Sequence, residues 1–547
     1  MLRAPLLRLG WALLAAAAAG LLLDAAFPGL GWWPLAFPAI MLALASLVGR
    51  RFWSAVLVGG VFGLAFYLPH VSWAGQFLGD HPLAWVPWVA LAGAEATLMA
   101  LLSPIITLAY RWVPQWRDTV RVRLVVLPLV VAGAWMTREL ILGTWPYGGF
   151  PWGRVAMSQA DSPIAPVASW IGVTGLGLLM VTWCAVLLEV VRWWRGGTRR
   201  LRPILRRPSR LAAVLAAVLV LVLVPLTVPA FPTSPAGSLR VGAVQGDGPA
   251  AYVDRAGPLA VLESQLAASE PLQGAQLDLV LWPEGSVDRD PMADRETADL
   301  LDAAARRYGA PILMNAASTT GASMYNTSFL WTENGPVATH AKHHPVPFGE
   351  YVPDRWFYEA IAPDLVNLLE REYAHGTDLP LLAVDDTQVG LAICFDVAFD
   401  DVVLAAIRND AQVFMFQTNN ADFRGTDENL QQLDFARMRA IETGRSVLNL
   451  STTGTSQAFA PDGSVLQALP VDEPGLILLE VELRDGRTPG TVINPWLRWL
   501  LPLGTGMLLA GLGIVLRLRP ASSAAQRAPR ATAPAEVVSS DHEPSKS

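Results

Sequence analysis

Long apolar stretches separated by arginine-bearing loops constrain the fold of this chain more than any other feature. A helix needs about 20 mainly apolar residues to cross a bilayer. The mean hydropathy of +0.36 and the low share of charged residues, 16%, agree with repeated crossing, because globular domains carry roughly 25% charged residues. The sequence predicts a polytopic α-helical membrane domain of eight spans, at residues 9–27, 33–49, 53–69, 84–110, 123–142, 167–191, 211–230 and 494–516.

Arginines are concentrated in alternate loops between these stretches. They precede the first span, follow the eighth, and occupy the loops between spans two and three, four and five, and six and seven. The remaining loops, 28–32, 70–83 and 143–166, hold a single arginine, Arg154 (the arginine-poor loops). Because basic residues favour the cytoplasmic side of a membrane, we expect both termini in the cytoplasm and the segment after span seven on the extracytoplasmic face.

Composition divides the chain into four parts. Residues 1–232 form the expected seven-span domain, 238–490 a soluble domain, 494–516 the eighth span and 518–547 a disordered cytoplasmic tail rich in Ala, Ser, Pro and charges. Within the soluble part, apolar strands are expected at 239–246, 277–285, 311–318, 324–332, 389–396 and 412–420, with two more in 446–463. Helical patterns alternate with them at 257–269, 298–309, 398–408 and 428–444. This alternation predicts an α/β sandwich, in which helices cover a sheet.

Three side chains in the soluble part suggest covalent catalysis. Glu284, Lys342 and Cys394 each end or follow an apolar run that is typical of a buried strand. A thiolate is a strong nucleophile, a carboxylate can take its proton, and an ammonium group can stabilise the oxyanion formed by attack on a carbonyl. A chain with 47 acidic and 40 basic residues also offers such a trio by chance, so the surrounding motifs decide.

Other site classes have little support. The seven histidines show neither an HExxH motif nor another metal-ligand spacing, so we expect no metal and no cofactor. The net charge of −7 gives no reason to expect nucleic acid as a partner. Cys184 lies in an apolar segment, where a small buried thiol is common, and Cys394 is expected to be free.

The motifs around the trio resemble a known superfamily. A Glu in WPEG (Glu284), a Lys after a second strand (Lys342) and a Cys in AICFD (Cys394) are similar to the catalytic residues of carbon–nitrogen hydrolases, or nitrilases. The resemblance implies a four-layer α-β-β-α sandwich and a Glu-Lys-Cys triad. A domain of this kind between a seventh and an eighth span, with PVPFGEYVP (345–353) and GTWPYGGFPWGRVAMSQADSP (143–163), resembles the apolipoprotein N-acyltransferase family.

That resemblance implies a role for each residue of the trio. Glu284 would be the general base and acid, Lys342 the oxyanion stabiliser and Cys394 the nucleophile, which would carry an acyl chain as a thioester. The donor would be a membrane phospholipid, and the acceptor the α-amine of the N-terminal diacylglyceryl-cysteine of lipoproteins. The implied location is the inner membrane of a bacterium, with the lipid bilayer as partner and without a cofactor.

Further residues are implied to support the site. Glu350 would be a carboxylate beside it, and Asn326 and Asn419 fall where relatives carry polar residues. Phe395 and Asp396 stand where the family usually has Tyr and Glu, so residue 395 offers no hydroxyl.

Two other functions remain open at this stage. A membrane-tethered carbon–nitrogen amidohydrolase would use the same triad on a small exported amide or nitrile, with water as second nucleophile. A transporter or receptor with an inert soluble domain would explain charges in or near the apolar stretches, namely Asp24, Glu95, Arg138 and Glu139. Asp24, Arg138 and Glu139 are equally explained as span-end residues, whereas Glu95 fits that explanation least. The aromatics of 345–365, with the loop 143–166, would form a lipid-facing lid or simply anchor at the interface.

Overall fold

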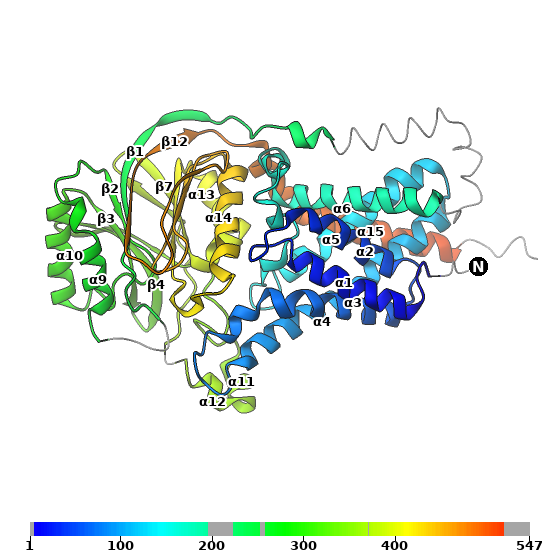
Figure 1. Cartoon of the computed structure of the whole chain (residues 1–547), viewed down its shortest axis with the longest axis horizontal. Coiled ribbons are helices and arrows are strands. Elements are labelled where there is room, and N and C mark those ends of the chain that lie inside the picture. The colour runs from blue at the N-terminus through cyan, green and yellow to red at the C-terminus, as the bar shows by residue number, and fades with distance from the viewer. Residues whose placement is uncertain (1–4, 195–222, 252–256, 370, 519–547) are drawn as a thin grey trace, which may run out of the picture.

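A bundle of apolar helices and an α/β part lie side by side in the computed structural model, which describes residues 5–194, 223–251, 257–369 and 371–518 (Figure 1). The bundle consists of α1 (Leu9–Asp24), α2 (Ala36–Leu47), α3 (Phe52–His70), α4 (Trp85–Trp116), α5 (Leu127–Leu142), α6 (Ala168–Trp194) and, from the far end of the chain, α15 (Pro489–Leu518).

Five helical segments are long and apolar enough to cross a membrane. They are Phe52–His70, Trp85–Trp116, Val122–Leu142, Ala165–Arg192 and Pro489–Leu518. The segments Leu9–Asp24 and Trp33–Leu47 are apolar but shorter, because each ends near Gly or Pro residues. Most of the expected seventh span, 211–230, and nearly all of the expected tail, 518–547, lie outside the described residues.

Two six-stranded sheets form the centre of the α/β part. The first has the order β12-β1-β2-β3-β4-β5 and the second β11-β10-β9-β8-β7-β6. Both sheets are mixed, since β1, β2 and β3 run parallel, as do β7, β8 and β9, while the outer pairs are antiparallel. The strands are β1 (Ser234–Gln245), β2 (Leu279–Leu281), β3 (Ile312–Thr320), β4 (Ser323–Thr332), β5 (Gly335–Ala341), β6 (Leu381–Val384), β7 (Thr387–Ile393), β8 (Val413–Thr418), β9 (Val447–Ser451), β10 (Gln457–Phe459), β11 (Val465–Ala468) and β12 (Gly475–Asp485).

Apolar side chains of the two sheets share one core. Val241 and Leu281 of the first sheet belong to the same buried cluster as Leu391 and Met415 of the second. A second cluster joins the other face of the first sheet to α10 (Arg295–Tyr308), which follows α9 (Ala260–Ala268). The other face of the second sheet packs with α13 (Asp400–Arg408) and α14 (Glu428–Thr443), in a cluster that continues into the bundle. Two short helices, α11 (Arg355–Ile361) and α12 (Pro363–Val366), interrupt the chain between β5 and β6.

The strand expected at 389–396 ends earlier than its apolar run. β7 stops at Ile393, and a 3₁₀ helix begins at Cys394 and continues to Ala398. The expectation was wrong at this end because Cys394 has φ 50°, in the left-handed region that a strand excludes. Strands β5, β6, β11 and β12 were not expected; β12 pairs along almost the whole of β1, a long-range contact that local pattern does not reveal.

The arginine-poor loops all meet the α/β part. Gly29 and Leu30 line a cavity of about 370 Å³ together with Leu430 of α14. Trp73 donates a hydrogen bond to Gln431 of α14 at 3.1 Å. The third loop adds a buried ion pair.

That ion pair joins Arg154 of the loop to Asp400 at the start of α13, with 2.7 Å between Nη1 and Oδ1. Asp400 also lies 2.8 Å from the guanidinium of Arg439, which pairs in turn with Glu442 at 2.8 Å. Asn494 of α15 donates to both carboxylates, at 3.2 and 3.0 Å. Each charge of this network has a partner of opposite sign, and the network joins the bundle to α13 and α14.

The four charges singled out in the apolar stretches do not pair with one another within the described part of the chain. Asp24 lies 3.4 Å from Nδ1 of His70. Glu139 accepts a hydrogen bond from Trp135 at 2.7 Å, and the guanidinium of Arg138 lies 4.0 Å from the centroid of that indole ring. Glu95 is buried on α4.

Candidate active site

The three residues of the trio stand where three strands end. Glu284 follows β2, Lys342 follows β5, and Cys394 follows β7, so the first two come from one sheet and the third from the other. Only 1% of the surface of Glu284 and 1% of that of Lys342 is exposed, whereas Cys394 is partly exposed. The site therefore combines two buried charged residues with a thiol that is only partly buried.

Lys342 lies between two carboxylates. Its Nζ is 3.2 Å from Oε1 of Glu284 and 2.8 Å from Oε2 of Glu350. Asn326 of β4 donates from Nδ2 to Oε1 of both glutamates, at 2.7 and 3.2 Å. The Oδ1 of Asn326 accepts a hydrogen bond from Asn315 at 2.8 Å, which fixes its amide orientation. The expected supporting residues Glu350 and Asn326 thus contact the charged pair directly.

Burial and charge shift the ionisation of this cluster. Burial raises the pKa of Glu284; the nearby Lys342 opposes that shift and the Glu350 carboxylate adds to it. Burial alone would lower the pKa of Lys342, but the two carboxylates raise it well above its usual value. Oε2 of Glu284 has no hydrogen-bond partner among the described residues. The lysine therefore stays charged, while Glu284 keeps a free oxygen for an incoming proton.

Cys394 is held in an unusual backbone conformation. A non-glycine residue at φ 50° is uncommon, and such strained positions cluster at functional sites, where the fold over-determines them. Burial and the Glu284 charge raise the pKa of the thiol well above its usual value, and Lys342 acts in the opposite direction. A raised pKa favours the neutral thiol, which a nearby base would have to deprotonate before Cys394 could act as a nucleophile.

A chain of polar side chains on the other side of Cys394 escaped the sequence analysis. Gln432 of α14 donates from Nε2 to Sγ of Cys394 at 3.4 Å. Asn420 donates to Oε1 of Gln432 at 3.0 Å and to Oε2 of Glu428 at 2.7 Å. Burial raises the pKa of Glu428 to about 8. The sequence predicted the helix that carries Glu428 and Gln432, but no local pattern indicated that these polar side chains face the site.

Asp396 connects the nucleophile turn to the lysine segment. Its fully buried carboxylate accepts hydrogen bonds from the backbone N–H groups of His343 at 3.2 Å and His344 at 2.8 Å. These residues directly follow Lys342, so Asp396 fixes the relative position of the ammonium and the thiol. The role of Asp396 here is structural, and the aspartate side chain is long enough to reach both N–H groups.

Phe395 meets the membrane part. Its ring stacks on Phe150 and on Trp152 of the third arginine-poor loop, with ring centroids 5.9 and 6.0 Å apart. Trp152 also donates to Gln431 of α14 at 2.7 Å. An aromatic ring without a hydroxyl fits this apolar stack, in which a phenol would need a partner.

Asn419 lies beside the site but outside its hydrogen-bond network. It donates to the carbonyl of Ala250 at 2.8 Å and accepts from the N–H of Ala421 at 3.1 Å. Within the described residues it has no hydrogen bond to Glu284, Lys342 or Cys394.

The two segments expected to form a lid contact each other. The hydroxyl of Tyr147 lies 3.1 Å from Oδ2 of Asp354 and 3.3 Å from the hydroxyl of Tyr358. Trp356, in α11, is 77% exposed, which leaves an apolar ring on the outside of this contact. The arrangement is compatible with either a lid or an interface anchor.

Chemically, the site combines a partly buried thiol, a buried carboxylate with a free oxygen, and a fixed ammonium. Such a group of residues suits nucleophilic attack on an acyl carbon and stabilisation of the resulting oxyanion.

Comparison with known proteins agrees with both parts of the chain. Residues 19–186 match the apolipoprotein N-acyltransferase N-terminal domain, and residues 240–488 match the carbon–nitrogen hydrolase family. An apolipoprotein N-acyltransferase from Mycolicibacterium smegmatis is 30% identical, over 92% of this chain and 84% of the relative. A protein of the same name from Ralstonia nicotianae is 28% identical, over 89% and 91%. Among solved structures, a variant of a nitrilase-superfamily amidase from Nesterenkonia AN1 is 20% identical, with TM-score 0.36, over 48% of this chain and 99% of the amidase.

Proposed function

Because the chain belongs to the apolipoprotein N-acyltransferase family, we propose that it moves an acyl chain from a membrane phospholipid to the α-amine of the N-terminal diacylglyceryl-cysteine of lipoproteins. The protein is an acyltransferase whose α/β part has a carbon–nitrogen hydrolase fold. The observation that carries the proposal is the meeting of Glu284, Lys342 and Cys394 at three strand ends, with the charges of the first two acting on the thiol.

The first half of the proposed reaction loads the enzyme. Glu284 takes the proton of the Cys394 thiol through its free Oε2, and the thiolate attacks an ester carbonyl of the phospholipid. Lys342 and backbone N–H groups near Phe395 stabilise the tetrahedral oxyanion. When the C–O bond breaks, Glu284 returns the proton to the leaving lysophospholipid, and the acyl chain remains on Cys394 as a thioester.

The second half transfers the chain to nitrogen. The neutral α-amine of the acceptor attacks the thioester carbonyl, and Glu284 takes a proton from the amine. The C–S bond breaks, the thiolate regains a proton from Glu284, and an amide is released. The reaction is ping-pong, and it needs no external energy source because an ester is converted into a more stable amide.

The membrane arrangement belongs to the same proposal. We assign eight spans in a bacterial inner membrane, with both termini in the cytoplasm. The catalytic domain (238–490) then lies at the outer face of that membrane, and its helices lie outside both sheets in an α-β-β-α order. The contact of all three arginine-poor loops with the α/β part supports this, since these loops and the domain then share one side. The acyl donor and acceptor are lipids, so a site packed against spans at that side can meet both.

A trapping experiment tests the mechanism. The full-length protein in detergent is incubated with phospholipid labelled in its acyl chain, and we expect label on Cys394 that hydroxylamine removes. Cys394→Ala should take no label, whereas Cys184→Ala, which changes the buried thiol of α6, should label normally. Label on Cys394→Ala would contradict the covalent route.

The amidohydrolase alternative predicts a different outcome. Such an enzyme would release ammonia from a small amide and would pass no acyl chain from phospholipid to a diacylglyceryl peptide. Transfer to that peptide, measured by its mass increase, separates the two functions.

A further inference from the structure

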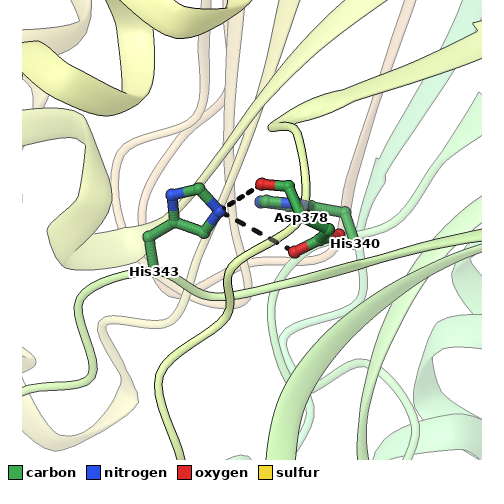
Figure 2. A group of neighbouring side chains, drawn as sticks. All are labelled: His340, His343 and Asp378. Atoms are coloured by element: carbon green, nitrogen blue, oxygen red, sulfur yellow. Dashed lines mark hydrogen bonds and ion pairs between the residues drawn. The ribbon is translucent and has the colours of Figure 1, made fainter.

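Two histidines and an aspartate, His340, His343 and Asp378, lie close together (Figure 2). His340 is near the end of β5, His343 directly follows Lys342, and Asp378 precedes β6. Nδ1 of His340 lies 3.1 Å from Oδ2 of Asp378, and Nε2 of His343 lies 3.7 Å from Oδ1 of the same carboxylate. One possible ligand atom from each residue lies within 4.8 Å of those of the other two.

These separations match the coordination shell of a small divalent ion. Zinc binds histidine nitrogen and carboxylate oxygen at about 2.0–2.2 Å, which places tetrahedral ligand atoms about 3.4 Å apart. The observed 3.1 Å to Oδ2 and 3.7 Å to Oδ1 of Asp378 lie on either side of that value, and the upper bound of 4.8 Å among the three ligand atoms means that the side chains must draw together to complete the shell. Two imidazoles and one carboxylate are a ligand set that zinc accepts.

The cluster is buried on one side and open on the other. The side chain of His340 is fully buried, that of His343 is 17% exposed, and that of Asp378 is 40% exposed. The open side gives an ion a path of entry and leaves room for water as a fourth ligand.

Without an ion, the two histidine side chains bond to the carboxylate and the backbone carbonyl of Asp378. Nε2 of His343 is 2.7 Å from the carbonyl oxygen of Asp378, and the His340 ring faces the Asp378 carboxylate. Metal binding requires both ligand nitrogens to give up their protons. The His340 proton then resides on Nε2, which is buried and has no partner within the described residues. The state that competes with metal binding is therefore a hydrogen-bonded cluster.

We propose that His340, His343 and Asp378 bind one divalent transition-metal ion, with the properties of Zn²⁺, that fixes the base of the segment 344–377. The segment leaves the core at His343 and returns at Asp378, so the ion would bridge its two ends. Backbone hydrogen bonds already close this base, from Gly376 to the carbonyl of Lys342 at 2.8 Å. The segment carries Glu350 and the exposed aromatics of α11. Because Lys342 directly precedes the ligand His343, the ion would act on the position of Lys342 and not on the substrate.

Zinc binding by the full-length protein tests the site. The chain is purified in detergent with a histidine-free affinity tag, stripped with a chelator and titrated with Zn²⁺. We expect one ion per chain, with affinity at least tenfold weaker in His343→Ala and in Asp378→Asn. Both are partly exposed and are therefore safer to replace than His340.

A nearby histidine provides the matched control. His344→Ala removes a ring that pairs with Asp401 at 2.9 Å, outside the cluster, and should bind zinc like the wild type. Wild-type protein without bound zinc, or equal binding by His343→Ala, would overturn the proposal and leave the cluster as a hydrogen-bonded pair.

A second measurement tests the bridging role. Limited proteolysis within 344–377 should slow when Zn²⁺ is added to the wild type and should not change in His343→Ala. Zinc that binds without protecting this segment would refute the bridge. Neither measurement uses acyl transfer, so its outcome is independent of the proposed function.

Discussion

Nε2 of Gln432 lies 3.4 Å from Sγ of Cys394, and it is the one side-chain hydrogen bond to this thiol in the described part of the chain. Gln432 belongs to α14. The residue before it, Gln431, accepts hydrogen bonds from Trp73 and Trp152 of the membrane part. Neighbouring residues of one helix thus bond to the Cys394 thiol and to two loops of the membrane part.

Loss of the Gln432 amide should slow thioester formation. A hydrogen bond to a charged group contributes about 1.5–3 kcal/mol, so Gln432→Leu is expected to reduce the single-turnover rate by roughly tenfold or more. The bond strengthens as the thiol becomes thiolate, hence the effect should fall on the rate and not on lipid binding. Gln412→Ala, which removes an amide bonded to Asp485 away from the site, is the control. An unchanged acylation rate in Gln432→Leu would refute the assignment.

Removal of the second carboxylate should shift the pH profile. Glu350 raises the pKa of Glu284, so Glu350→Gln lowers it, and the base stays ionised to lower pH. The acidic limb of the kcat/KM profile should therefore move to lower pH, while the maximal rate falls because Lys342 loses a partner at 2.8 Å. Glu359→Gln, at an exposed position of α11, should leave the limb in place. A shift to higher pH would contradict this electrostatic account.

Glu428 should make stability depend on pH. Burial raises its pKa from 4.5 to about 8, so the folded protein binds more protons than the unfolded chain between these values. The stability that Glu428 contributes is complete at low pH and is lost as the pH rises toward about 8. Glu428→Gln keeps an acceptor for Asn420 but cannot ionise.

The Tm of Glu428→Gln relative to wild type should therefore increase as the pH is raised from about 5.5 to 8.5. Glu263→Gln, on the exposed side of α9, should give a constant difference across the same range. A difference for Glu428→Gln that stays constant as well would show that this carboxyl does not titrate as the burial implies.

The ion pair between the domains should couple in a double-mutant cycle. Arg154→Leu leaves Asp400 with one arginine, and a buried pair that loses a partner costs about 3–5 kcal/mol. Asp400→Asn should also destabilise. The double variant should lose less than the sum, by about 0.5–3 kcal/mol, because the two sites are in contact. Thermal unfolding in detergent measures the three losses; strict additivity would mean that the 2.7 Å contact contributes no coupling.

Much of the site could be predicted from sequence because it stands at strand ends. The apolar runs before Glu284, Lys342 and Cys394 suggested strand ends, and resemblance of the motifs added Glu350 and Asn326. Gln432 could not be found in this way, since a glutamine in an amphipathic helix has the same local pattern whether it faces solvent or a thiol. Asn419 shows the opposite case. Its place in the sequence matches that of polar residues in relatives, but its side chain donates a hydrogen bond to the carbonyl of Ala250.

By itself, the sequence determined which segments are apolar enough for a membrane and which alternate as strands and helices, and it placed a Glu, a Lys and a Cys after apolar runs. These are properties of local composition and period, and each can be read within a short window. Only the tertiary structure decided that Lys342 lies between two carboxylates, that Asp396 holds the backbone after Lys342, and that His340, His343 and Asp378 meet. Those relations join residues up to 58 positions apart, and they exist because two sheets share one core and bring separate strand ends together.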